Sequence, residues 1–420
     1  MKLGIVTFGC RLNSLESEAI ISSFKERGWT VNNKEEDDDD LIIINTCTVT
    51  SKSDQEARRI IRHFGNSIPT IVTGCYANLE QTSEIEGLGA KVKVIKDKSE
   101  LLRNYSNIND ISDRVESDEH KFDFDVRNFA FHSRASIKIQ DGCDNNCSYC
   151  AVHLARGKSV SLNPDTIKER IKALEDNGNS EITLVGVNVA SYNYNGVNIS
   201  HLLEEILPSL RRNTRLRLSS IEPDYIDDLF YDVVKDEHIF PFFHLPIQSV
   251  SKRVLEKVGR KYGKSDLQKI VDNLKKAKDN PYIAADIISG LPYEEDTDAE
   301  ITYNFLKDNH FSRLHVFPFS PRKGTDAYSM KHPPERIRDE RAKRLNDLSK
   351  DLYASYIESN ISKTLEAVTE RKTETGTFVT TANYIKAHVD GLYLDEGKIV
   401  RGTLIKGDGN TLKFDNISPL

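Results

Sequence analysis

Apolar and polar residues alternate in three different ways along the chain, and each way predicts a different kind of domain. Near the N-terminus, continuous apolar runs at 3–8, 41–46 and 70–74 are each followed by a helical pattern, the first of them at 14–27. The second helix is predicted to open with a capping box formed by Ser53 and Glu56. Continuous apolar strands between helices indicate a parallel α/β sheet covered on both faces, which we expect over residues 1–128.

The middle of the chain repeats this alternation on a larger scale. Apolar strands are predicted at 137–140, 181–187, 215–219, 241–245, 284–288 and 313–317, and helices between them at 164–177, 199–210, 265–278 and 298–309. Six strands with crossover helices predict a parallel, partly open (β/α)6 barrel whose chemistry lies at the carboxyl ends of the strands. Together with a charged amphipathic helix from 334 to about 362, this unit is expected to span residues 133–362.

The last stretch, residues 363–420, changes to short alternating strands separated by Gly and Asn turns. So few residues of this kind predict a small β-barrel. Phe378 and Tyr384 lie in it, and both base stacking and core packing remain open for these rings.

Composition adds little to this division. The 420 residues carry 58 Lys and Arg against 65 Asp and Glu, a balance that neither favours nor excludes a nucleic-acid partner. The first apolar run is too short for a signal peptide, and no apolar stretch reaches the roughly 18 residues of a membrane span. We therefore expect a cytoplasmic protein without membrane contact. The acidic run 35–40 is expected to be a solvated loop, and the polar stretch 110–125 a connection whose domain boundary lies near 128–133.

Three cysteines dominate the chemistry: Cys143, Cys147 and Cys150 follow the first strand of the barrel with the spacing C-x3-C-x2-C. A loop this short, called here the cluster loop, can direct three thiolates at one iron–sulfur cube and leave its fourth iron open for a reactant. A zinc site with His153 as fourth ligand is the alternative. Zinc sites usually contain two separated C-x2-C pairs, and the sequence has no second pair.

The other three cysteines, called here the N-terminal set, are Cys10, Cys47 and Cys75, and each follows one of the apolar strands of the first domain. Ligands bind open parallel sheets at the carboxyl ends of the strands. Three cysteines at that edge are placed to hold a second three-thiolate cluster. Burial of the cysteines in the core is the alternative, since free cysteine is often fully buried.

The cluster loop resembles the signature of the radical S-adenosylmethionine (SAM) enzymes, in which the open iron binds SAM and an electron from the cluster splits it into a 5′-deoxyadenosyl radical. The blocks around Cys10, Cys47 and Cys75 are similar to the N-terminal domain of the methylthiotransferases, a radical SAM subfamily. The resemblance implies two [4Fe–4S] clusters, the second of which carries or donates sulfur. Asn-Thr-Cys-Thr-Val-Thr at 45–50 and Gln-Asp-Gly-Cys at 140–143 most resemble the MtaB-type enzymes, which act on N6-threonylcarbamoyladenosine next to the tRNA anticodon.

The resemblance also assigns the polar residues that follow the barrel strands. Such positions bind the ribose, amino and carboxylate groups of SAM, and the candidates here are Asn188, Ser220, Glu222 and Gln248. Helix capping and loop hydrogen bonds are the alternative roles for these residue types.

Two departures affect the site. Val250 replaces the usual glycine after Gln-Ser, and Val152-His153-Leu154 replaces a stretch that usually contains Pro-Tyr, whereas Arg156 and Gly157 are retained.

The C-terminal barrel resembles the TRAM domain, an RNA-binding appendage of tRNA-modifying enzymes. The expected partners are therefore a tRNA anticodon stem-loop, bound partly by this domain, and an electron donor such as a flavodoxin or ferredoxin. Competing interpretations are a sister methylthiotransferase acting on isopentenyladenosine in tRNA or on a ribosomal-protein aspartate, and a radical SAM enzyme whose second cluster only transfers electrons. A non-catalytic iron–sulfur electron carrier is a third, although a carrier does not need the barrel.

Overall fold

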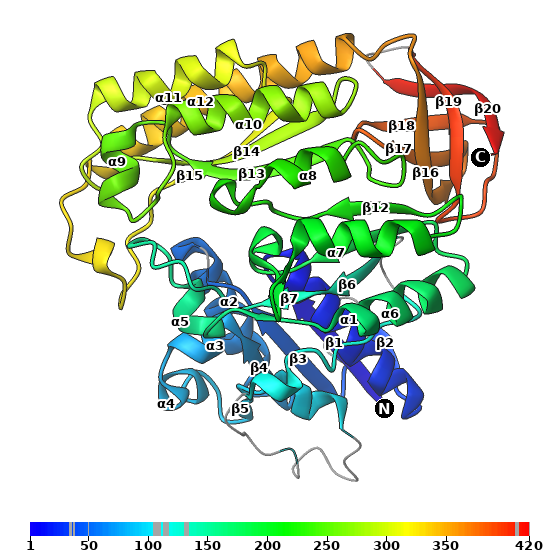
Figure 1. Cartoon of the computed structure of the whole chain (residues 1–420). Coiled ribbons are helices and arrows are strands. Elements are labelled where there is room, and N and C mark those ends of the chain that lie inside the picture. Colours follow the sequence, from blue (N-terminus) through cyan, green and yellow to red (C-terminus); the bar gives the residue numbers. More distant parts are fainter. Residues whose placement is uncertain are drawn as a thin grey trace.

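A computed structural model of the chain describes residues 1–32, 36, 38–48, 50–103, 111, 117–129, 134–407 and 411–419. It consists of an N-terminal parallel sheet, a central half-open barrel and a closed C-terminal β-barrel, which Figure 1 shows in blue, green to yellow, and red. Parts of the predicted acidic loop and connection, and most of the predicted boundary at 128–133, lie outside the described residues. Within the described part of the chain, no helix has both the length and the apolar character needed to cross a membrane.

The N-terminal sheet is parallel, as predicted, with the strand order β2-β1-β3-β4-β5. Every residue of the central strands β3 and β4 is buried, because helices cover both faces of the sheet. The strands are β1 (Lys2–Thr7), β2 (Thr30–Asn32), β3 (Leu41–Thr46), β4 (Thr70–Gly74) and β5 (Val92–Val94), and the helices are α1 (Arg11–Glu26), α2 (Ser51–Phe64), α3 (Cys75–Leu79) and α4 (Thr82–Glu86).

The predicted start of helix α2 is wrong by two to three residues. Its N-cap is Thr50, whose side chain accepts a hydrogen bond from the Ser53 backbone N–H, and Ser53 in turn caps the Thr50 backbone. Ser53 is therefore the third residue of the helix and not its cap, because a serine can take either position in a reciprocal cap. The inward face predicted for this helix is confirmed, with Ile60, Ile61 and Phe64 buried.

The central barrel is built from six parallel strands in two groups of three, β12-β9-β6 and β13-β14-β15. Single bridges from Leu216 to Ile239 and from Ser220 to His244 join the two groups into one curved sheet. The strands are β6 (Ala135–Lys138), β9 (Glu181–Val185), β12 (Arg215–Leu218), β13 (Phe242–Gln248), β14 (Tyr282–Ser289) and β15 (Arg313–Pro318). This is the predicted (β/α)6 half-barrel.

Helices cover the outside of the barrel, and short hairpins lie at its rim. The helices are α5 (Val152–Arg156), α6 (Pro164–Asp176), α7 (Ile199–Ile206), α8 (Asp228–Val233), α9 (Lys252–Lys257), α10 (Lys264–Ala277) and α11 (Asp296–Asp308). The hairpin strands are β7 (Gln140–Asp141) with β8 (Val160–Ser161), and β10 (Asn193–Tyr194) with β11 (Val197–Asn198). The helix α12 (Glu335–Glu358) packs on β15, where the buried Ser349 hydroxyl accepts a hydrogen bond of 2.9 Å from the Leu314 backbone N–H.

The C-terminal barrel is closed by the strand order β16-β17-β18-β20-β19. Its strands are β16 (Thr364–Thr373), β17 (Gly376–Thr381), β18 (Lys386–Asp390), β19 (Ile399–Lys406) and β20 (Leu412–Pro419). Its core extends into the central barrel, since the Tyr384 ring packs against Phe242 and Tyr282 at ring-centroid distances of 4.6 and 5.5 Å. Of the two roles left open for Tyr384, packing is therefore the one seen.

Polar contacts join all three parts. Arg215 of the central barrel pairs with Glu366 of the C-terminal barrel at 3.0 Å. On the N-terminal side, the Ser51 and Ser320 hydroxyls lie 2.7 Å apart, and Arg322 forms an ion pair with Asp54. The central barrel thus contacts both of the other parts (Figure 1).

Candidate active site

The cluster loop begins directly after β7 and is held by backbone hydrogen bonds at several points. The Cys143 N–H donates to the Gly157 carbonyl at 3.0 Å, and the Ser148 N–H donates to the Val258 carbonyl at 3.1 Å. Gly142 precedes the first cysteine with φ +71°, and a Cβ there would lie 1.8 Å from the Lys158 carbonyl oxygen. Only glycine fits this position, because it combines a left-handed conformation with a close backbone approach.

Gln140 organises the start of this loop. Its side-chain amide donates to the Gly142 carbonyl at 2.7 Å and to the Ser159 hydroxyl at 2.9 Å, while its oxygen accepts from the Asn188 N–H at 2.9 Å. Gln140 therefore ties the cluster loop to the end of β9. The sequence analysis placed Gln140 in the motif without a role; its position between the first barrel strand and Cys143 was the available signal.

The three thiols of the cluster loop form one group. Burial raises the pKa of Cys143 to about 11 and that of Cys150 to about 12, and the neighbouring thiols add to both shifts. Backbone N–H groups donate to sulfur, from Asn145 to Cys143 and from Val152 to Cys150, each at 3.4 Å. Thiols with raised pKa values need a strong local positive charge to ionise, and a bound metal cluster supplies it. The donor set thus fits a cluster with three thiolate ligands.

Arg260 lies beside the cluster loop and contacts Tyr149 within it; the sequence analysis missed both residues. Arg260 forms an ion pair with Glu222 and donates to the Tyr149 hydroxyl at 2.8 Å. Burial raises the pKa of Glu222, with Arg260 opposing the shift. No pattern marked Arg260, because it follows a short helix and meets Glu222 only in the folded barrel.

The four SAM candidates lie near the carboxyl ends of the barrel strands, and each has different neighbours. Asn188 is buried and caps a short turn through Ser191, but its side-chain nitrogen has no partner among the described residues. Ser220 lies 3.2 Å from His244, Glu222 pairs with Arg260, and Gln248 ends β13 with φ +66°. The orphaned Asn188 amide is a donor available to a ligand, whereas the Glu222 carboxylate is already engaged.

The two departures from the family pattern also have places in the structure. Val250 is buried, and its backbone N–H donates to the Thr302 hydroxyl at 3.1 Å. Helix α5 contains His153, which is half-buried, and Leu154, whose exposed fraction is 46 %. The same helix ends at Arg156, the residue that matches the family.

The N-terminal set lies at the carboxyl ends of three neighbouring strands, β1, β3 and β4. Cys10 is the exposed N-cap of α1, Cys47 follows β3, and Cys75 is the first residue of α3. Asn13 draws two of these ends together, because its side-chain amide donates to the Phe8 and Thr46 carbonyls at 2.9 Å each. No disulfide joins any of the six cysteines of the chain.

Close backbone contacts surround this set. Gly74 has φ +97°, and a Cβ there would lie 2.4 Å from the Thr46 carbonyl oxygen. A Cβ on Gly9 would lie 2.5 Å from the Cys47 sulfur. The alternative of three core cysteines does not fit Cys10, which is exposed.

A buried charge network joins the two cysteine sets; we define it as Glu16, Lys98, Lys138, Asp141 and Arg156. Arg156 donates to Glu16 at 2.9 Å and to Asp141 at 3.1 Å, and its Nε donates to the Cys75 sulfur at 3.4 Å. Burial alone would lower the pKa of Arg156, but the two carboxylates outweigh it and hold that pKa well above its ordinary range. The same arginine that ends the helix after the cluster loop thus contacts the N-terminal set.

A second polar group lines the barrel interior on β13, β14 and β15. One oxygen of Asp286 lies 2.7 Å from His244 Nε2 and 3.2 Å from His315 Nδ1. Burial would raise the pKa of Asp286, but the two imidazoles lower it to about 2. The alternation of inward residues along each strand was a signal for these positions, but it did not show that the three side chains meet.

Comparisons with known proteins follow the same division of the chain. Residues 137–306 match the Radical SAM superfamily, and residues 2–95 match the Uncharacterized protein family UPF0004. The chain is 34% identical to a Bacillus subtilis protein named "Threonylcarbamoyladenosine tRNA methylthiotransferase MtaB", across 95% of this chain and 93% of that protein. A Treponema pallidum protein of the same name is 32% identical across 91% and 93%.

A related but differently named protein also matches. It is the "tRNA-2-methylthio-N(6)-dimethylallyladenosine synthase" of Protochlamydia amoebophila, at 31% identity across 88% of this chain and 86% of that protein. Among solved structures, the radical SAM methyltransferase TsrM of Kitasatospora setae is similar with a TM-score of 0.51 and 13% identity, across 75% of this chain and 72% of that one. At that identity the likeness concerns the fold alone.

Proposed function

Because the chain belongs to the MtaB family of radical SAM methylthiotransferases, we propose that it transfers a methylthio group to carbon 2 of N6-threonylcarbamoyladenosine in tRNA. Carbon 2 of the purine carries no acidic proton, so a base in the protein has nothing to abstract at neutral pH. A radical route is the chemistry that reaches such a carbon. The names of the relatives support the substrate, and the two cysteine sets support the reaction.

The radical SAM family uses SAM and a [4Fe–4S] cluster, and we assign this cluster to Cys143, Cys147 and Cys150. When bound, the cluster supplies the electron that splits SAM into methionine and a 5′-deoxyadenosyl radical. The loop provides three thiols and no fourth, which leaves one iron for SAM. Around it, the free amide of Asn188 is available to the nucleoside, and Ser220 and Gln248 follow at the next strand ends. Arg260 holds Glu222 and Tyr149 in one place, which shapes the wall of the site.

We assign a second [4Fe–4S] cluster to Cys10, Cys47 and Cys75, with the role of carrying or donating sulfur. The observation that carries this proposal is the convergence of three strand ends with the Arg156 side chain. That arginine donates to the Cys75 sulfur from a helix that follows the cluster loop by two residues. A merely structural set of cysteines needs no hydrogen bond from the neighbouring active site.

The chain would divide into three units, residues 1–128, 133–362 and 363–420. The anticodon stem-loop of tRNA would contact the last of these, the C-terminal barrel. A flavodoxin or ferredoxin would supply electrons. We propose that the reaction takes place in the cytoplasm, where a tRNA substrate would be found.

The second candidate function is methylthiolation of isopentenyladenosine in tRNA. One observation favours it: a relative named as a dimethylallyladenosine synthase is 31% identical across most of both chains. The two candidates use the same clusters and differ only in the group on the N6 nitrogen of the base.

The first test is anaerobic analysis of iron and sulfide in the reconstituted protein, beside Cys143→Ala and Cys75→Ala. We expect about eight irons in the parent and about four in each variant. About four irons in the parent, lost only in Cys143→Ala, would remove the second cluster and the sulfur-donor role with it.

The substrate is tested next, with tRNA from a strain that lacks the enzyme. Mass spectrometry of nucleosides after reaction with the parent should show 2-methylthio-N6-threonylcarbamoyladenosine. A product derived from isopentenyladenosine alone would replace the first candidate with the second.

A further inference from the structure

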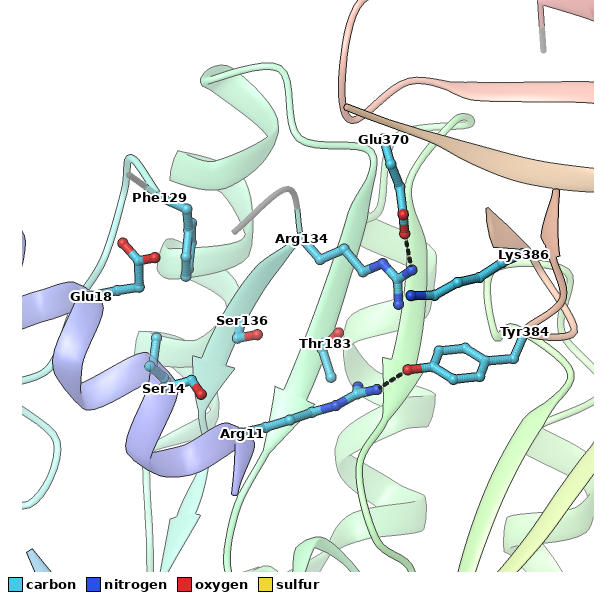
Figure 2. Close-up of a pocket in the computed structure, with 11 residues that line it drawn as sticks. Arg11, Ser14, Glu18, Phe129, Arg134, Ser136, Thr183, Glu370, Tyr384 and Lys386 are labelled. Carbon is cyan, nitrogen blue, oxygen red and sulfur yellow. Dashed lines mark hydrogen bonds and ion pairs between the residues drawn. The ribbon is translucent and has the colours of Figure 1, made fainter. Parts of the chain in front are cut away.

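A cavity of about 330 Å³ lies where the three parts of the molecule meet, and nothing so far described occupies it. Helix α1 forms one wall, the inward residues Ser136 of β6 and Thr183 of β9 form another, and the C-terminal barrel closes the third. Figure 2 shows Arg11 and Lys386 pointing into it from opposite sides. We call it the interface pocket.

Three cations, Arg11, Arg134 and Lys386, and two carboxylates, Glu18 and Glu370, line the interface pocket. Arg11 donates to the Tyr384 hydroxyl at 2.9 Å, and it forms no ion pair with any residue that the structure describes. Lys386, at the start of β18, likewise forms no ion pair within the described ranges. A third cation, Arg134, is already paired with Glu370 (Figure 2). Two of the three positive charges are therefore not balanced by a direct carboxylate partner.

The pKa of Tyr384 indicates that the electrostatic potential in the interface pocket is positive. Burial raises the pKa of its phenol, but Arg11, Arg134 and Arg217 together outweigh burial and lower that pKa below its ordinary value. A phenol ionises more easily where the potential is positive. An anionic group that enters the interface pocket would be stabilised for the same reason.

The interface pocket neighbours the N-terminal set along the chain. Arg11 follows Cys10 directly in the chain, and Ser136 lies two residues before Lys138 of the buried charge network. On a purine, carbon 2 and carbon 6 lie on either side of N1, so a substituent on N6 leaves the ring on a different edge from carbon 2. A base with carbon 2 near the cysteines therefore directs its N6 substituent away from them.

We infer that the interface pocket binds the carboxylate-bearing N6 substituent of the target adenosine through Arg11, Lys386 and the Tyr384 hydroxyl. The inference rests on the proposed function and adds the residues that select the substrate. A threonylcarbamoyl group brings a carboxylate, a hydroxyl and a urea, all of which form hydrogen bonds with these donors. An isopentenyl group offers none, and its entry would desolvate two cations without compensation.

The experiment uses the reconstituted full-length protein and three anticodon stem-loop RNAs. They are identical except at the target adenosine, which is unmodified, isopentenylated or threonylcarbamoylated. Binding is measured anaerobically by fluorescence anisotropy, and methylthiolation of the threonylcarbamoylated RNA is measured by mass spectrometry. The variants are Lys386→Gln and Arg11→Gln, and the matched control is Lys372→Gln, which removes an exposed lysine of the same small barrel that pairs with Asp395.

We expect the parent to bind the threonylcarbamoylated RNA about 10-fold more tightly than the unmodified RNA, as one or two charge-assisted hydrogen bonds allow. Lys386→Gln should reduce this binding preference to about 3-fold or less, while binding of the unmodified RNA stays the same. In the methylthiolation assay, the same variant should raise KM with little change in kcat. Arg11→Gln should have a similar effect. Because Arg11 neighbours Cys10, its iron content is measured alongside, and Lys386→Gln carries the test if iron is lost. Lys372→Gln should behave as the parent.

An unchanged preference in Lys386→Gln would overturn the inference, and so would a parent that binds the three RNAs equally. The methylthiolation assay separates these failures from that of the function. A parent that modifies the threonylcarbamoylated RNA without preferring it in binding retains the proposed function and loses the interface pocket as its selector.

Discussion

The cluster loop and the N-terminal set each contain three cysteines, but different parts of the structure bring the cysteines of each set together. Cys143, Cys147 and Cys150 lie within one loop, so a short segment places all three sulfur atoms. Cys10, Cys47 and Cys75 come from three strands and meet only when β1, β3 and β4 pair in parallel. The first site is a property of a segment and the second a property of a fold. The second is therefore the one that depends on correct pairing of the strands within the N-terminal sheet.

The two sets nevertheless share a local device. Gly142 precedes Cys143 and Gly74 precedes Cys75, both with positive φ and with a neighbouring carbonyl oxygen where a Cβ would be. In each case the left-handed residue turns the chain sharply so that the next cysteine starts the loop or helix. The difference lies in the partner: Lys158, which lies between helix α5 and strand β8, for Gly142, and the neighbouring strand β3 for Gly74.

The largest expected effect comes from removing one cysteine of each set. Cys147→Ala should abolish SAM cleavage and the methylthio product together, because no radical forms. Cys47→Ala should retain reductive SAM cleavage, measured as 5′-deoxyadenosine by chromatography, and lose the methylthio product. Equal loss of SAM cleavage in both variants would mean that the sets do not have separate roles.

Arg156 tests the link between the two sets. Arg156→Gln leaves Glu16 and Asp141 buried with fewer counter-charges, and removal of one partner from a buried ion network costs about 3–5 kcal/mol. The measurement is the free energy of unfolding from anaerobic denaturant titration. Arg156→Lys is the matched control for charge: it keeps a cation but lacks the Nε–H that reaches Cys75.

For the same reason, Arg156→Lys should lower the reduction potential of the N-terminal cluster and leave that of the cluster loop unchanged, as followed by electron paramagnetic resonance. A hydrogen bond to a ligand sulfur raises the potential of a cluster. Identical potentials in the variant and the parent would show that the contact with Cys75 has no electronic role.

The glycines give the next smaller effect. Gly74→Ala and Gly142→Ala should each lose the iron of the adjacent site only, with backbone strain of about 1–3 kcal/mol measured by unfolding. Gly28→Ala is the matched control, because Gly28 also has φ +82° but no atom lies within 4 Å of the added Cβ. It should show a modest loss of stability and full iron content; a comparable loss of iron in all three would point to general unfolding.

The smallest expected effect concerns Asp286, which belongs to neither cysteine set and should therefore leave both iron sites intact when it is replaced. The pKa of Asp286 is about 2 in the folded protein, below its unfolded value, so its stabilisation is fully present above about pH 4 and is lost as the pH falls through 2. The difference corresponds to about 2 kcal/mol. Asp286→Asn should remove this acid dependence in unfolding experiments and leave the iron content unchanged at neutral pH. A variant that unfolds between pH 4 and 2 as the parent does would contradict it.

Much of the architecture was predictable because local patterns determine it. Strands β9, β12, β14 and β15 and helices α6 and α10 lie within a few residues of their predicted positions, since their apolar periodicity also forms the buried face. The start of α2 was misplaced because Thr50 and Ser53 both have capping side chains. The short helices α8 and α9 were not predicted, because six residues each hold too little periodicity to register.

The sequence by itself determined where the reactive residues lie along the chain: which cysteines share a loop, which follow a strand, and which glycines precede them. It did not determine which side chains meet across long separations. Arg156 with Cys75, Arg260 with Glu222, and Asp286 with two histidines are decided by how the sheet, the half-barrel and the small barrel pack. The physical reason is range: periodicity and turn chemistry act over a few residues, whereas a buried ion or hydrogen-bond partner is chosen by the whole fold that excludes water around it.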